Sequence, residues 1–174
     1  MKVRLLLSIS AFSLGLLIVA ISLLSIEAVS AGENNITSKK LYMGQVLPDH
    51  IAYPLLMAMD RFYLETAGQT ERIYKQIEYA DRRLFYTQEL LAQKDTEKLP
   101  LALSTLTKAE KYLIKASLES IEIKSDENVH NAILSSLQYH YSQLEKLTHK
   151  FTDSQRSILD ELREEESSLI EQFQ

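Results

Sequence analysis

The chain of 174 residues contains no cysteine and carries a formal net charge of −5 at pH 7. Without cysteine it cannot form disulfides, thiolate metal sites, iron–sulfur clusters or a covalent haem attachment of the c type. The negative charge is a poor match for the phosphate backbone of DNA or RNA, so we expect no nucleic-acid partner.

The first 31 residues have the pattern of an export signal. Lys2 and Arg4 precede an uncharged run over residues 5–26, and the small residues Val29-Ser30-Ala31 follow. As a helix, this run of 22 residues would be about 33 Å long, enough to cross a hydrocarbon layer of roughly 30 Å. Residues 1–31 are therefore predicted to be either a signal peptide cleaved after Ala31 or a retained membrane anchor.

Both alternatives predict the same location for the rest of the chain. The basic N-terminus stays on the cytoplasmic side, so the C-terminal part is expected to be exported. It is then periplasmic or extracellular, or it is anchored in the cytoplasmic membrane through residues 5–26 with its C-terminal domain outside.

The remaining sequence predicts a polar tether over residues 32–47 and a single helical domain over residues 48–174. After Gly32 only Gly44 and Gly68 remain, and the whole chain has 3 prolines. A sequence with so few helix breakers and no alternating strand pattern favours helices throughout.

The expected fold is all-α, with a short first helix and about four long antiparallel helices that form hairpins or an elongated bundle. Thr70, Asp126 and Thr152 are the expected N-caps of three of these helices. Apolar residues at spacings of three and four predict the inner faces, including Ile158 and Leu162 on the last helix. The predicted helices span residues 54–67, 70–94, 97–123 and 127–150, with a fifth beginning at residue 153.

The loop before the first helix resembles the opening motif of a bacterial domain family of unknown function. The matching residues are Leu47-Pro48-Asp49-His50, Tyr53-Pro54-Leu55-Leu56 and Asp60-Arg61. The family pattern is approximately Leu-Pro-Gly-(His/Asp)-x-x-Tyr-Pro-Leu-Lys followed by an acidic-Arg pair, and the resemblance extends over about residues 43–118. Asp49 stands in place of the usual glycine and Leu56 in place of the frequent lysine. The resemblance implies an exported or membrane-linked helical domain and no particular activity.

The same loop supplies the candidate partner-binding residues Pro48, Asp49, His50 and Tyr53. It is an irregular, chemically mixed segment next to a helical frame, and loops of this kind often carry binding residues. A purely structural role is the alternative, because Pro54 fixes the backbone at the helix start and keeps Tyr53 extended.

The sequence predicts no catalytic residue, no metal ligand and no cofactor. His130, His140 and His149 lie 10 and 9 residues apart on one predicted helix, outside the spacing of three or four that joint ligation from one helix requires. His140 falls on the apolar face and is expected to be a core histidine. The acidic residues over 160–166 are expected to form a solvated face.

The predicted function is that of a non-enzymatic interaction or scaffold module at the cell envelope, whose partner is an envelope protein or a cell-wall component. A periplasmic helical chaperone is the first alternative, because Phe151-Thr152-Asp153-Ser154-Gln155 is similar to the Leu-Thr-x-x-Gln motif of such proteins. A metal- or haem-binding helical bundle is the second alternative.

Overall fold

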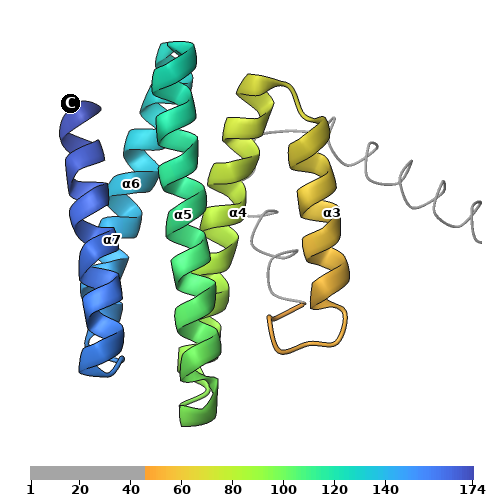
Figure 1. Ribbon diagram of the computed structural model, residues 1–174, viewed down its shortest axis with the longest axis vertical. Coiled ribbons are helices and arrows are strands. Elements are labelled where there is room, and N and C mark those ends of the chain that lie inside the picture. The colour runs from red at the N-terminus through yellow and green to blue at the C-terminus, as the bar shows by residue number, and fades with distance from the viewer. Residues whose placement is uncertain (1–45) are drawn as a thin grey trace, which may run out of the picture. The chain divides into compact units, whose positions relative to one another are not determined.

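The computed structural model describes residues 46–174, which form an all-α fold. The predicted signal or anchor over residues 1–31 and nearly all of the predicted tether lie outside the described residues. Figure 1 shows successive long helices running in opposite directions, as the sequence predicts. The helices are α3 (Tyr53–Thr66), α4 (Gln69–Ala92), α5 (Leu99–Ile123), α6 (Glu127–Thr148) and α7 (Asp153–Gln172), with a 3₁₀ turn at Thr96–Lys98 before α5.

Local capping determines where most of these helices begin. Pro54 and Pro100 both lie in the first turn of a helix, where the missing backbone N–H costs little. The Asp126 carboxylate accepts hydrogen bonds from the backbone N–H groups of Asn128 and Val129, which confirms it as the N-cap of α6. The predicted cap at Thr70 is wrong: Gly68 has the extended backbone of the N-cap, and Thr70 already lies inside α4.

The start of α7 is a capping box. The Gln155 side-chain oxygen accepts a hydrogen bond of 3.1 Å from the backbone N–H of Thr152, and the Thr152 side chain accepts one from the backbone N–H of Gln155. This reciprocal arrangement satisfies groups that the first turn of a helix leaves without partners. It gives a structural reason for the Thr-x-x-Gln spacing that resembles the chaperone motif.

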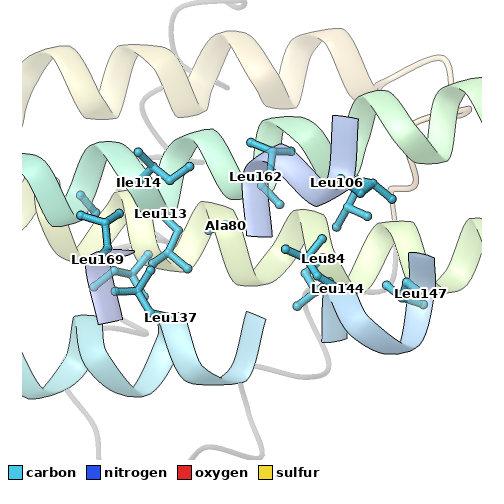
Figure 2. Close-up of a cluster of buried hydrophobic side chains, with 14 of the residues drawn as sticks. Ala80, Leu84, Leu106, Leu113, Ile114, Leu137, Leu144, Leu147, Leu162 and Leu169 are labelled. Carbon is cyan, nitrogen blue, oxygen red and sulfur yellow. The ribbon is translucent and has the colours of Figure 1, made fainter. Parts of the chain in front are cut away.

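The core lies where α5 meets the neighbouring helices. Helix α5 packs against α4, α6 and α7, and aliphatic side chains from all four helices meet between them (Figure 2). Leu84, Leu106, Leu113, Leu137 and Leu144 are almost completely shielded from solvent. Burial of this apolar surface is the main favourable contribution to folding in a chain without disulfides.

The buried face of α7 differs from the sequence prediction. On α7 the buried residues are Leu159 and Glu166 together with Leu162 and Leu169, whereas Ile158 is exposed and was wrongly assigned to the inner face. Glu166 is likewise not part of a solvated acidic face. Compared with the prediction, α7 is rotated about its own axis. The helices that pack against α7 determine this rotation, and the residue spacing within one helix does not specify them.

Helix α3 packs on α4 at the side of the bundle (Figure 1). Leu55, Met59 and Phe62 share a face, as their spacing predicts, but that face is exposed. The one buried residue of α3 is Asp60, so a charged side chain faces α4. None of the helices within residues 46–174 is both long enough and apolar enough to cross a membrane.

Candidate functional site

The structure places the four predicted partner-binding residues in a turn that is held by contacts within the chain. The Asp49 carboxylate accepts a hydrogen bond of 2.6 Å from the Lys98 ammonium group, and this contact lowers the pKa of Asp49. The His50 ring accepts a bond of 3.1 Å from the backbone N–H of Ala52. Pro48 is half-buried within the turn, and Asp49 and His50 remain exposed to solvent.

Tyr53, the fourth of these residues, packs inward. Its ring meets the buried ring of Tyr86 edge to face, with 6.1 Å between the ring centroids. Aromatic pairs in this geometry contribute about 0.5–1.5 kcal/mol beyond the area they bury. Tyr53 thus anchors the start of α3 to α4, and whether the turn also binds a partner stays a prediction.

An ion cluster joins α3 to α4. Asp60 forms an ion pair and hydrogen bond with Arg82, and the Arg83 guanidinium lies 3.7 Å from the same carboxylate oxygen. The Arg82 guanidinium also lies 4.7 Å from the Tyr79 ring centroid, and that of Arg83 lies 4.5 Å from the Tyr112 ring centroid. Buried guanidinium groups stack favourably on aromatic rings in this way.

We expect Asp60→Asn to loosen α3 while the other helices stay folded, because the substitution removes the negative charge that both arginines face. Charged hydrogen bonds contribute about 1.5–3 kcal/mol, which corresponds to amide exchange roughly 10- to 100-fold faster in α3. Hydrogen-exchange mass spectrometry measures this directly. Glu65→Gln, which breaks the exposed Arg61–Glu65 pair on the same helix, is the matched control. Unchanged α3 exchange in Asp60→Asn would contradict the assignment.

A second polar cluster lies inside the bundle and centres on His140, whose side chain is completely buried. Its Nδ1–H donates a hydrogen bond of 2.9 Å to Oε2 of Glu110 on α5, and its Nε2–H donates one of 3.1 Å to Oδ1 of Asp81 on α4. The Ser136 hydroxyl donates to the same Asp81 oxygen at 3.1 Å. The prediction of a core histidine is confirmed, with two carboxylates as its partners.

Glu166 of α7 completes this cluster. Glu110, His140 and Glu166 are each completely buried, and one potential ligand atom from each lies within 4.8 Å of those of the other two. Both carboxylate oxygens of Glu166 and Oε1 of Glu110 have no hydrogen-bond partner. Buried polar atoms without partners are uncommon in folded proteins and call for an explanation.

The protonation states follow from burial and from the neighbouring charges. Burial alone would lower the pKa of His140, but the charges of Glu110 and Asp81 and the hydrogen bonds to them outweigh it and raise the pKa to about 9. Burial raises the pKa of Glu166 to about 11, and Glu110 beside it acts in the same direction. At neutral pH His140 is therefore an imidazolium and Glu166 is a neutral acid.

The sequence contains a signal for this cluster in the positions of its two glutamates. Glu166 occupies an inward position between Leu162 and Leu169, and Glu110 occupies one between Leu106 and Leu113. A glutamate at an apolar position of a helix is rarely buried without a partner. The spacing of residues within one helix does not reveal this cluster, because its four side chains come from four helices.

Comparison with known proteins gives no relative for this chain: no protein-family model, no curated protein and no solved structure matches it.

Proposed function

We propose that this chain is a non-enzymatic interaction module at the cell envelope, outside the cytoplasm, and that the exposed face of α3 binds an apolar segment of an envelope protein. The observation that carries the proposal is a continuous row of exposed apolar side chains. Ile51, in the turn before α3, and Leu55, Met59 and Phe62 of α3 follow one another at spacings of four, four and three residues, and they are 94%, 67%, 36% and 61% exposed.

These four residues lie close together in the chain, whereas the other exposed apolar residues are distributed over four helices. Leu118 and Ile121 form one pair on α5, whereas Tyr74, Tyr139 and Ile158 are single residues on α4, α6 and α7, and exposed apolar residues of this kind are normal on protein surfaces. A row at the spacing of one helix face is instead typical of helix recognition by a partner groove.

The chemistry of the row favours a protein partner over a sugar polymer. Its side chains are aliphatic, thioether and aromatic, and they offer contact area rather than hydrogen bonds. Two of the neighbouring charged groups, Arg61 and Glu65, already form a pair of 2.9 Å with each other. The location outside the cytoplasm is supported by the export pattern of residues 1–31.

A photo-crosslinking residue placed at Phe62 in living cells tests this proposal. We expect one or two discrete adducts, and we expect a second substitution, Leu55→Asp, to reduce their yield at least tenfold, because a buried anchor of an interface contributes about 2 kcal/mol or more. Ile158→Asp, which places the same charge at an exposed apolar site on α7, is the matched control and should leave the yield unchanged.

Two outcomes would overturn the proposal. Equal losses in the Leu55 and Ile158 variants would show that the α3 face is not the contact surface. A broad mixture of unfolded clients would favour the chaperone alternative, which requires a large apolar surface rather than one row. Intact-mass analysis of the native protein, run alongside, distinguishes cleavage after Ala31 from a retained anchor.

A further inference from the structure

We propose that Glu110, His140 and Glu166 form a binding site for one divalent transition-metal ion between α5, α6 and α7, with Asp81 of α4 as the outer partner that orients His140. This site is separate from the α3 face and does not depend on the function proposed above.

The first argument is the donor set. An imidazole nitrogen and two carboxylates are common ligands of Zn²⁺ and of related first-row ions. The ligand atoms lie within 4.8 Å of one another. Opposite ligands of one ion are at most about 4.2 Å apart when each bond is about 2.1 Å long, so small side-chain adjustments bring all three into range.

The second argument is the unfilled bonding capacity of the cluster. Three carboxylate oxygens, both of Glu166 and Oε1 of Glu110, are buried without a hydrogen-bond partner. Leaving one buried polar group unsatisfied costs about 1–3 kcal/mol, and a bound cation would use these oxygens as ligands.

The third argument is the outer partner. Asp81 accepts a hydrogen bond from Nε2–H of His140, and the Ser136 hydroxyl in turn holds Asp81. A histidine that ligates a metal through one nitrogen almost always donates its other N–H to a carboxylate or carbonyl, which fixes the tautomer and the ring orientation. Nε2 is engaged by Asp81, so Nδ1, which faces Glu110, would be the ligating nitrogen once it has released the proton that it donates to Glu110 in the metal-free chain.

The charges of the cluster also favour a bound cation. When a metal ion displaces the protons of His140 and Glu166, the cluster presents three carboxylates around one neutral imidazole, while the nearby Arg82 and Arg83 are paired with Asp60. The donor set disfavours Ca²⁺, which takes six to eight oxygen ligands and often uses backbone carbonyls. The three ligand residues lie inside helices, where the backbone carbonyls accept helical hydrogen bonds.

The test uses the full chain, unfolded and refolded with one equivalent of Zn²⁺ or Co²⁺ or with EDTA, because the site is closed to solvent. We expect one ion per chain, a higher melting temperature with Zn²⁺ than with EDTA, and a visible Co²⁺ absorption band that reports nitrogen and oxygen ligands. A metal-to-protein ratio near zero, or equal melting temperatures with Zn²⁺ and EDTA, would overturn the proposal.

Three variants assign the residues. Glu166→Gln keeps the size of the side chain and should weaken Zn²⁺ binding at least 100-fold. Asp81→Asn should weaken it about 10- to 100-fold while the Co²⁺ band persists, because Asp81 positions the ligand without touching the ion. Glu165→Gln changes the exposed neighbour on α7 and should have no effect. Equal Zn²⁺ affinity in Glu166→Gln and the unmodified chain would refute the site.

Discussion

Replacing His140 by leucine is expected to lower the free energy of unfolding by about 3–5 kcal/mol, measured by denaturant titration at pH 7 in EDTA. The substitution removes the cation between Glu110 and Asp81 and leaves the completely buried Glu110 without its cationic partner. Removal of one member of a buried charge pair has a cost of this size because the remaining charge keeps its desolvation penalty. The change in side-chain packing contributes less to the loss of stability, since leucine and histidine differ little in volume.

Two further variants separate the charge effect from a general loss of packing. His149→Leu changes an exposed histidine near the end of α6 and should alter stability by less than about 0.5 kcal/mol. The double variant His140→Leu with Glu110→Met removes both charges of the buried pair and should regain much of the lost stability. If the double variant is as unstable as the single one, the cost lies in packing and the charge argument is wrong.

The stability of the metal-free protein is expected to fall as the pH rises from 7 to 9, which is unusual for an acidic protein. A group whose pKa is higher in the folded state binds its proton more tightly there, so its contribution is present at low pH and is lost as the pH rises through the folded pKa. For His140 the window runs from 6.5 to about 9, and for Glu166 it runs from 4.5 to about 11.

Between pH 7 and 9 the folded chain therefore holds up to two protons more than the unfolded chain. Each such proton corresponds to about 1.4 kcal/mol per pH unit, so we expect a decrease of about 1–3 kcal/mol per unit. The charged groups that act on this pair are Glu110 on α5, Asp81 on α4 and Glu165 on α7. Two other groups with shifted pKa values titrate outside the range of pH 7 to 9. The pKa of Glu119 is lowered, so it titrates below this range, and that of Tyr79 is raised, so it titrates above it.

Denaturant titrations in EDTA at pH 7, 8 and 9 measure this slope. Glu166→Gln removes one of the two titrating groups and should roughly halve it, whereas His149→Leu should leave it unchanged. A stability that is flat or rises over this range in the unmodified chain would contradict the protonation states assigned to the cluster.

The sequence predicts most of this fold because the start and end of each helix depend on neighbouring residues. The prolines at 54 and 100, the Asp126 cap and the Thr152–Gln155 capping box act within one turn, and they place α3, α5, α6 and α7 close to the predicted ranges. The N-cap at Gly68, which was not predicted, also depends only on neighbouring residues. A glycine with an extended backbone serves as N-cap without a side-chain hydrogen bond.

Only the tertiary structure decides which charged residues are inside. The sequence by itself determined the helices, the inward position of His140 and the absence of cysteine chemistry. It did not determine that Asp60 faces two arginines of the next helix, or that Glu110 and Glu166 enclose His140. The physical reason is that helix periodicity relates residues three or four apart, whereas residues 110, 140 and 166 meet through the mutual rotation and packing of three helices.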